Sequence, residues 1–542
     1  MATMAEDAWG LPAVPAELRR RYVDDGWWTD ETFAGFVDRR VAAAPDLRVR
    51  IWSEQRPCTT TAAALHRDAA RLAAGLVRRG LGPGDVVAYQ LPNWAETLVV
   101  LWAGFRIGAT LVPIVHFYGP REVRFIVRQS GARALVVAAG DHLGDLDLGD
   151  LGLDTVVVVG DSAGSSAAVP GGAVRFADLL EAEPLPDPVP VDPDAPAMVG
   201  YTSGTTADPK GVVHTHRTLL AEVRQLASLN VLGGRAAVMA SPLAHMTGML
   251  GGSLVPLHQG NPVELIDRWD PGRVLSICAE HDLSPGGGAT IFLTSLLDHP
   301  DFGPQHLAAM PRFGLGGAPV PRAVAERAEG LGIAVTRAYG STEHPSITGS
   351  TPDVPAEQRM FTDGCPMPGV ELRLVDADGA PVGVGTPGEI VSRGPDLFAG
   401  YTDPALTAAA LDPDGWYHTG DVGVLDDQGF LTITDRLSDL IIRGGRNLSA
   451  AEIEERLATM PGVAEVAVVA APDERLGEHA CAVVRPAPGV DGELDLAAVQ
   501  AHLAAVGLPK QKWPEELQVV ADFPRTPSGK IRKRDLRDRL RR

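Results

Sequence analysis

The sequence predicts an α/β protein with parallel sheets, followed by a small separate C-terminal domain. Short runs rich in β-branched residues alternate with longer segments in which apolar residues recur at helical spacing. A proline- and aspartate-rich connector at 183–196 interrupts this alternation. After a change of character near 435–447, a stretch of about 100 residues has its own helix and strand patterns, which suits a separate domain.

The elements follow in order along the chain. A helix is expected over 62–79, ending at Gly80, and a second helix begins at Ala95. Strands are expected at 86–91, 110–115, 134–140 and 155–160, and further glycine-punctuated strands and helices fill 228–435. In the C-terminal stretch, 451–460 reads as a helix and 463–471 as a strand. A Rossmann-type domain would need an early G-x-G-x-x-G after a strand, and the sequence has none.

Composition excludes several classes of protein. The 542 residues are 45% hydrophobic and 22% charged, so the chain can bury large cores. A formal net charge of −21 argues against non-specific binding to nucleic acid or anionic lipid. Four dispersed cysteines exclude a disulfide scaffold. The acidic N-terminus and the lack of an apolar run of about 20 residues predict a cytoplasmic protein without a membrane span.

The first motif with chemical meaning is YTSGTTADPKG at 201–211. Backbone amides and hydroxyl groups in such a loop can surround phosphate oxygens, and Lys210 adds positive charge. It is not a Walker A loop, because Gly211 follows the lysine. On composition alone the segment also suits a solvated turn. The residues expected to bind phosphate are Thr202, Ser203, Gly204, Thr205, Thr206 and Lys210.

Further motifs follow in a fixed order: GGAP at 316–319, YGSTE at 339–343, WYHTGD at 416–421, DR at 435–436, RGGRN at 443–447 and PSGK at 527–530. Together with 201–211, this series resembles the adenylate-forming enzymes, which include acyl-CoA synthetases, luciferases and peptide-synthetase adenylation domains. The resemblance extends from about residue 30 to 540. Residues 505–533 look most like bacterial cyclohexanecarboxylate- and medium-chain acyl-CoA ligases.

The resemblance implies a fold and a reaction. The fold is a large multi-layered N-terminal domain with parallel sheets and a β-barrel-like subdomain over 1–436, and a small mobile α+β domain over 437–542. A carboxylate attacks the α-phosphorus of ATP to give an acyl-adenylate, and a thiol then displaces AMP. Because an anion approaches a polyanion, the site must neutralise charge and align the reacting oxygens.

Within the N-terminal domain the resemblance assigns roles to single residues. Glu343 looks like the Mg²⁺-binding carboxylate, with Thr342 against the α-phosphate. Tyr339 would stack on adenine, and His245 resembles an aromatic wedge beside the acyl pocket. Taken singly, such residues also suit a helix N-terminus, a core tyrosine and a satisfied histidine. The glycine-rich strand ends expected near the nucleotide are Gly316, Gly317, Ala318, Pro319 and Gly340.

Nearer the C-terminus, Asp421 would accept hydrogen bonds from the ribose hydroxyls, with Arg436 also reaching the ribose. Lys530 corresponds to the lysine that bridges the acyl carboxylate and the α-phosphate, although on composition it is one charge of a basic tail. Arg443, Gly444 and Gly445 fall where the pantetheine arm of coenzyme A passes.

Two positions depart from the family pattern. Ala207 replaces a glycine in the phosphate loop, which puts loop mobility or ATP affinity in doubt. Ser438 stands at the hinge position, where the family usually has aspartate or lysine.

The segment after His245 carries no charge, which suits a neutral acyl group, and small residues at 248, 251 and 252 suggest room for a medium-chain, alicyclic or aromatic acid. The leading hypothesis is an ATP- and Mg²⁺-dependent acyl-CoA synthetase. A stand-alone enzyme that loads a carrier-protein phosphopantetheine stays open, as does an inactive binding or regulatory homologue.

Overall fold

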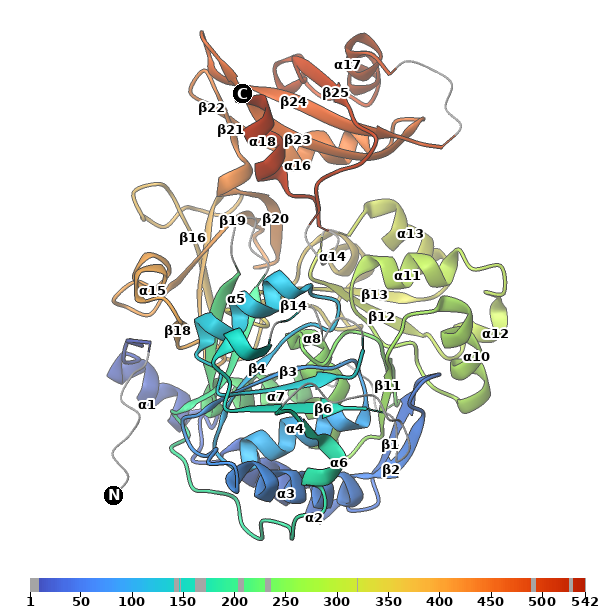
Figure 1. Cartoon of the computed structure of the whole chain (residues 1–542). Coiled ribbons are helices and arrows are strands. Elements are labelled where there is room, and N and C mark those ends of the chain that lie inside the picture. Colours follow the sequence, from blue (N-terminus) through green and yellow to red (C-terminus); the bar gives the residue numbers. More distant parts are fainter. Residues whose placement is uncertain are drawn as a thin grey trace. The chain divides into compact units, whose positions relative to one another are not determined.

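The computed structural model describes residues 9–140, 146, 148–160, 172–202, 209–229, 235–318, 320–488, 494–525 and 530–541. The chain divides into two compact units (Figure 1). The first comprises Met1–Thr202, Pro209–Glu371 and Arg393–Tyr417, and the second comprises Leu372–Ser392 and His418–Arg542. The domain boundary expected after Arg436 lies inside the second unit and stays a prediction.

The largest sheet of the first unit has eight strands in the order β18-β9-β8-β4-β3-β5-β6-β7. Strands β3 to β8 pair in parallel, whereas β9 is antiparallel to β8 and to β18. The strands are β3 (Val86–Gln90), β4 (Thr110–Pro113), β5 (Ala134–Ala138), β6 (Thr155–Val159), β7 (Val174–Arg175), β8 (Pro196–Thr202), β9 (Lys210–Thr215) and β18 (Gly400–Tyr401).

Both faces of this sheet are covered, and successive residues of a strand therefore enter different cores. In β3, Val87 and Tyr89 pack in the same core as α3 and α4, whereas Val86 and Ala88 pack with α5. Figure 1 shows α5 on one side of β3 and β4 and the other two helices on the opposite side. The helices are α3 (Ala62–Val77), α4 (Ala95–Arg106) and α5 (Pro120–Ser130). The expected alternation of strands and helices is confirmed here.

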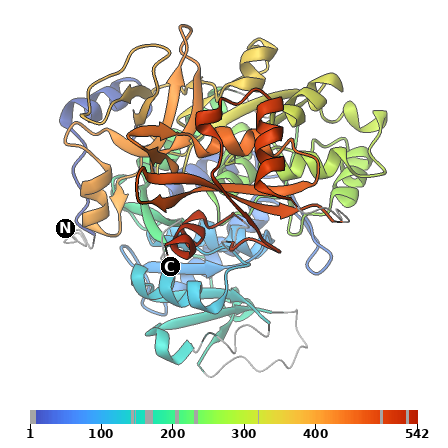
Figure 2. The same ribbon diagram turned by 90° about the horizontal axis from the view of Figure 1, so that it is seen from above.

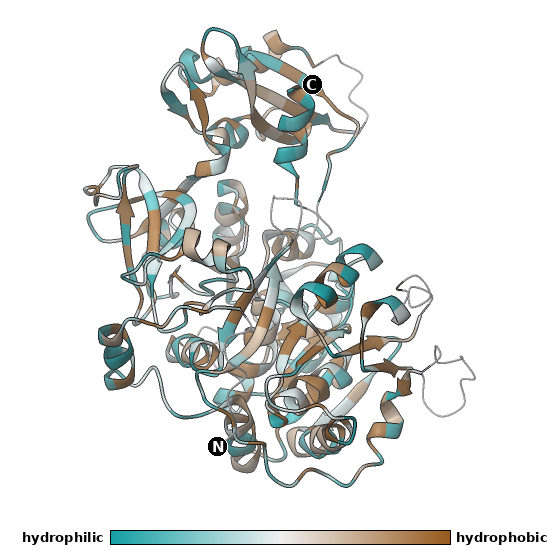
Figure 3. Ribbon diagram, turned by 60° about the vertical axis from the view of Figure 1, so that its left-hand side comes forward, coloured by the Kyte–Doolittle hydropathy of each residue, from teal (hydrophilic) through white to brown (hydrophobic). Residues whose placement is uncertain are grey.

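Two smaller sheets complete the first unit. One has the order β10-β11-β1-β2, with β1 (Arg48–Trp52), β2 (Cys58–Thr61), β10 (Val238–Met239) and β11 (Val263–Ile266). The other has the order β12-β13-β14-β15, with β12 (Arg312–Gly316), β13 (Ala334–Tyr339), β14 (Thr348–Gly349) and β15 (Cys365–Pro366). Hydrophobic residues gather in the central strands (Figure 3).

Further helices surround these sheets: α1 (Ala16–Asp24), α2 (Phe33–Ala43), α6 (Phe176–Leu179), α7 (His216–Ser228), α8 (Met246–Met249), α9 (Val255–Gln259), α10 (Pro271–His281), α11 (Thr290–Leu297), α12 (Pro304–Leu307), α13 (Arg322–Gly330), α14 (Ala356–Phe361) and α15 (Pro404–Ala410).

The second unit contains a four-stranded sheet, β16-β17-β19-β20, and a five-stranded sheet, shown in orange and red in Figure 2. The first consists of β16 (Glu371–Val375), β17 (Gly388–Arg393), β19 (Tyr417–Leu425) and β20 (Leu431–Arg436). The second consists of β21 (Ile441–Arg443), β22 (Arg446–Leu448), β23 (Val463–Asp473), β24 (Gly477–Pro486) and β25 (Glu516–Val519). Its helices are α16 (Ala450–Leu457), α17 (Leu496–Ala505) and α18 (Lys533–Leu540). The helix and strand expected after residue 450 are confirmed as α16 and β23.

Candidate active site

The predicted phosphate loop connects the antiparallel strands β8 and β9. Thr202 at the end of β8 lies opposite Lys210 at the start of β9. An antiparallel pair brings both ends of its connection to one edge of the sheet, so the two residues stand together at the base of the loop. The other predicted phosphate-binding residues, Ser203, Gly204, Thr205 and Thr206, lie outside the described residues, as does Ala207.

Lys210 and Glu343 converge on Tyr401, a residue that the sequence analysis did not identify. The Lys210 Nζ atom lies 5.4 Å from the centre of the Tyr401 ring, within the range of a cation–π contact. The Tyr401 hydroxyl donates a hydrogen bond of 2.8 Å to Glu343 Oε1. Burial, followed by the Glu343 carboxylate, raises the pKa of Tyr401, so the phenol keeps its proton and remains a donor. The structure thus brings the predicted phosphate-binding lysine and the predicted metal-binding glutamate to one side chain.

The loop that carries Thr342 and Glu343 turns tightly after β13. A Cβ atom on Gly340 would lie 2.0 Å from the carbonyl oxygen of Pro345, so only glycine fits there. The Ser341 amide donates to the carbonyl oxygen of His344, and the His344 amide donates to Ser341 Oγ. These contacts account for the glycine and the serine of the Y-G-S-T sequence. They also fix the position of the backbone at Glu343.

His214 of β9 also contacts the loop that carries Thr342 and Glu343. Its Nε2 atom lies 2.7 Å from the carbonyl oxygen of Thr342, and Nδ1 lies 3.1 Å from Thr218 Oγ1. Because a carbonyl only accepts, Nε2 carries the proton. Burial lowers the pKa of His214 to about 4, so the ring is neutral at physiological pH. A Cβ atom on Gly200 would lie 2.9 Å from the Thr342 methyl group, which explains the glycine in β8.

The residues expected near adenine stand at the ends of two paired parallel strands. Gly316 ends β12 and pairs with Ala338, and Tyr339 ends β13 and is 9% exposed. Gly317 has φ +78°, a conformation that favours glycine. Ala318 is exposed, and Pro319 lies outside the described residues. The structure therefore brings Gly316, Gly317 and Tyr339 to one sheet edge, as expected for parallel strands.

His245 is exposed and immediately precedes α8. The first glycine after it is explained by backbone packing and not by pocket size. A Cβ atom on Gly248 would lie 2.0 Å from the carbonyl oxygen of Pro242, and Cβ atoms on Gly251 and Gly252 would lie 2.9 and 3.0 Å from Met239. Backbone packing therefore explains Gly248, whereas the neighbours of Gly251 and Gly252 are side-chain atoms, and the room for a bulky acyl group stays a prediction.

In the second unit, Asp421 and Arg436 are paired with each other. They lie opposite one another in β19 and β20, and Arg436 Nε is 2.7 Å from Asp421 Oδ1. Asp421 is 7% exposed and Arg436 is exposed. Desolvation, followed by the positive charge of Arg436, lowers the pKa of Lys530, whereas Asp421 acts in the opposite direction.

Arg443, Gly444 and Gly445 form the hairpin turn between β21 and β22. Gly444 and Gly445 have φ of +57° and +79°, as a two-residue hairpin turn requires. Arg443 Nε donates to Glu515 Oε2 at 3.1 Å, and this carboxylate raises the pKa of Arg443. These residues lie in a different unit from Lys210 and Glu343.

The carboxylate of Glu343 fits a magnesium ion that takes few protein ligands. Among the described residues, no group of three or more His, Cys, Asp or Glu side chains has the arrangement of a metal site. Glu343 is 8% exposed, and its Oε2 atom receives no hydrogen bond from a described residue. Mg²⁺ in nucleotide sites uses one or two carboxylates together with phosphate oxygens and water, which matches a single glutamate beside a phosphate loop. In the described ranges, no helix is long and apolar enough to cross a membrane.

Comparison with known proteins identifies the family. Residues 37–402 match the AMP-binding enzyme family, and residues 452–530 match the AMP-binding enzyme C-terminal domain. This chain belongs to the AMP-binding enzyme family. It is 34% identical to the medium-chain fatty-acid–CoA ligase of Escherichia coli (strain K12), over 95% of this chain and 92% of the relative. It is also 34% identical to a feruloyl-CoA synthase of Amycolatopsis sp, over 89% of this chain and 94% of the relative.

A solved structure agrees with this family membership. The crystal structure of ATP-bound MatB from Rhodopseudomonas palustris superposes with a TM-score of 0.82 at 28% identity, over 93% of this chain and 98% of that one. The family member is thus an adenylate-forming enzyme with the expected large α/β domain and small C-terminal domain. The expectation of an AMP-forming acid–thiol ligase is confirmed at the level of the family.

Proposed function

We propose that this AMP-binding family enzyme activates a carboxylic acid with ATP and transfers the acyl group to the thiol of coenzyme A. The observation that supports this most strongly is the convergence of Lys210 and Glu343 on Tyr401, at the base of a loop rich in hydroxyl groups and glycine. A cation and a metal-binding carboxylate beside such a loop suit a nucleotide polyphosphate.

In the first half-reaction, an oxygen of the carboxylate forms a bond with the α-phosphorus of ATP, and the bond to the β-phosphate oxygen breaks to release pyrophosphate. Lys210 and the loop 202–210 bind the departing phosphates. Glu343 would hold Mg²⁺, which when bound supplies positive charge against the phosphate oxygens. Thr342 lies next to this carboxylate and would contact the α-phosphate. Tyr339 and the glycine-rich end of β12 would bind adenine.

The remaining roles are proposed for residues of the second unit. Asp421 and Arg436 already form an ion pair, so ribose hydroxyls would share the Asp421 carboxylate with Arg436. Lys530 would bridge the acyl carboxylate and the α-phosphate. In the second half-reaction, the thiol sulfur bonds to the acyl carbon, AMP leaves with the carboxylate oxygen, and the thiol proton passes to solvent. Arg443, Gly444 and Gly445 would contact the pantetheine arm.

For the acid we propose a medium-chain, alicyclic or aromatic carboxylic acid with no charged group besides its carboxylate. Residues 246–254, which form α8 and the following turn of π-helix (Leu250–Leu254), carry no charged side chain, and such an environment disfavours a second charge on the substrate. A π-helical turn often marks a functional site. The two named relatives act on a medium-chain fatty acid and on ferulate, which fall in these classes by their names.

The proposal is tested by measuring pyrophosphate release with ATP, Mg²⁺ and a panel of carboxylates, with and without coenzyme A. We expect release with a neutral acid and formation of its CoA thioester. Adenylate formation without thioester formation would favour a carrier protein as acceptor. No release above background with any acid would favour an inactive binding homologue.

A further inference from the structure

One short segment of the chain holds Glu343 and its neighbour at three points. Asp396 Oδ1 lies 3.2 Å from His344 Nε2. The amide of Phe398 donates to the carbonyl oxygen of Glu343 at 2.8 Å, and the Tyr401 hydroxyl donates to the Glu343 carboxylate. Residues 396–401 therefore determine where Glu343 stands, although they are more than 50 residues away from it in the sequence.

Behind this segment, two carboxyl groups are buried against each other. Glu222 of α7 and Asp396 both have zero exposure, and Asp396 lies near enough for its charge to raise the pKa of Glu222. Ser346 Oγ donates to Glu222 Oε1 at 2.6 Å. The second oxygen of each group, Glu222 Oε2 and Asp396 Oδ2, is buried and has no donor among the described residues. Two ionised carboxylates cannot remain in contact without water, whereas one proton between these two oxygens satisfies both.

The surroundings decide which group carries the proton. Burial disfavours ionisation of Asp396, but the neighbouring His344 outweighs it and holds the pKa of Asp396 below its usual range. Burial, followed by the Asp396 charge, raises the pKa of Glu222 well above its usual value. The other titratable groups in range are His214, which is neutral, and Tyr22. These directions place the proton on Glu222, whose Oε2, unpaired among the described residues, can donate to the likewise unpaired Oδ2 of Asp396.

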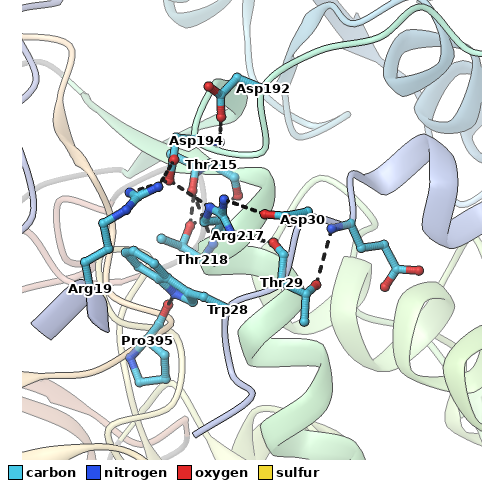
Figure 4. Close-up of polar contacts among 11 residues, drawn as sticks. Arg19, Trp28, Thr29, Asp30, Asp192, Asp194, Thr215, Arg217, Thr218 and Pro395 are labelled. Carbon is cyan, nitrogen blue, oxygen red and sulfur yellow. Dashed lines mark hydrogen bonds and ion pairs between the residues drawn. The ribbon is translucent and has the colours of Figure 1, made fainter. Parts of the chain in front are cut away.

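The N-terminal part of the chain also contacts Pro395, the residue before Asp396. Trp28 Nε1 donates to the carbonyl oxygen of Pro395 at 2.7 Å (Figure 4). The N-terminal segment that carries Trp28 is tied to Arg217 of α7, whose Nη2 lies 3.1 Å from Asp30, and Arg217 Nε also lies 3.0 Å from Asp194 in the connector before β8 (Figure 4). The contact of Asp396 with His344, and the hydrogen bonds made by Pro395 and Phe398 on either side of it, therefore restrict its movement away from Glu222.

We propose that Glu222 and Asp396 form a permanent acid–carboxylate pair that positions Glu343 through His344, Ser346 and the segment 396–401. Neither carboxyl group contacts a reacting atom, so both are positioning residues. The pair itself does not depend on the function proposed above, whereas its effect on turnover rests on that function.

The pair is tested first by infrared spectroscopy of the whole protein near neutral pH. The wild type should show the carbonyl-stretch band of an un-ionised carboxylic acid, and this band should disappear in Glu222→Gln and persist in Glu357→Gln, an exposed control. A wild-type spectrum identical to that of Glu222→Gln in this region would overturn the pair.

The positioning role is tested by comparing two replacements of Glu222 in ATP–pyrophosphate exchange. Glutamine reproduces one donor and one acceptor, so Glu222→Gln should keep KM for MgATP within about twofold of wild type. Leucine provides neither, so Glu222→Leu should raise that KM by about tenfold, as loss of a supporting contact behind a metal ligand does. Equal KM values in the leucine variant and the wild type would overturn the positioning role. If the wild type itself shows no exchange, the proposed function fails, while the infrared result still decides the pair.

Discussion

The Glu343 carboxylate is anchored at one oxygen by Tyr401, and its other oxygen receives no hydrogen bond from a described residue. A fixed carboxylate of this kind loses little conformational freedom when it binds a cation. Its contribution to cation binding therefore depends on its negative charge and on the hydrogen bond from Tyr401. Both can be removed separately, because glutamine keeps the shape of Glu343 and phenylalanine keeps the ring of Tyr401.

Glu343→Gln should reduce ATP–pyrophosphate exchange by roughly 100-fold or more, because the carboxylate that would hold Mg²⁺ against the phosphate oxygens is lost. Exchange is measured with saturating acid over a range of Mg²⁺ concentrations. Glu357→Gln is the matched control, since Glu357 is an exposed residue of α14. If the two variants have equal rates, Glu343 has no role in binding the metal nucleotide.

Tyr401→Phe should raise KM for MgATP by about tenfold and leave the thermal unfolding midpoint nearly unchanged. The ring that packs under Lys210 remains, and only the donor to Glu343 is removed. A shift in KM without a shift in unfolding separates a positioning role from a purely structural one. A variant that unfolds earlier but binds MgATP normally would contradict the assignment.

At the scale of elements, features that depend on neighbouring residues in the sequence could be predicted. Contacts between residues far apart in the sequence could not. The strand and helix alternation of β3 to β6 follows from local apolar periodicity, and the strand-end positions of Gly316 and Tyr339 follow from parallel pairing. Tyr401 and His214 reach the 339–343 loop from strands far away in the sequence, and nothing in the sequence around them signals that contact. The buried pair of Glu222 and Asp396 was missed for the same reason.

Gly248 shows a different limit, because its small size was interpreted as pocket volume and is explained by backbone packing. Gly248→Ala should destabilise the protein by about 2 kcal/mol or more, since its Cβ would meet the backbone of Pro242 at 2.0 Å. Gly330→Ala is the control, because nothing lies within 4 Å of its added Cβ. Chemical denaturation of both variants measures the effect. Equal free energies of unfolding would mean that the start of α8 tolerates a side chain and that the space beside it is open.

At the scale of the whole molecule, buried neutral histidines couple stability to pH. Burial lowers the pKa of both His214 and His216 to about 4, whereas an unfolded chain titrates histidine near 6.5. As pH falls from about 6.5 to about 4, the unfolded state takes up protons that the folded state does not, so the free energy of unfolding decreases. Each histidine should contribute about 3 kcal/mol to this loss, and the effect should level off below pH 4.

The measurement is the thermal unfolding midpoint of the wild type and His216→Gln across this pH range. His216 accepts a hydrogen bond from the amide of Phe33, and glutamine can accept the same bond. The difference between the two proteins isolates the histidine from buried carboxylates such as Glu222, whose raised pKa acts in the opposite direction. Parallel curves for the two proteins would show that His216 does not remain neutral in the fold.

Lys210, Glu343 and Lys530 are proposed to neutralise the negative charge where the acid meets ATP. If an acyl-adenylate forms there, one oxygen of the substrate carboxylate must end in AMP. A substrate carboxylate labelled with heavy oxygen is converted to its CoA thioester, and the AMP that is released is weighed by mass spectrometry. Attack of the carboxylate on the α-phosphorus predicts one heavy oxygen in AMP, with Lys530→Ala forming labelled AMP far more slowly than the exposed-lysine control Lys510→Ala. Thioester formation with unlabelled AMP would contradict an acyl-adenylate intermediate.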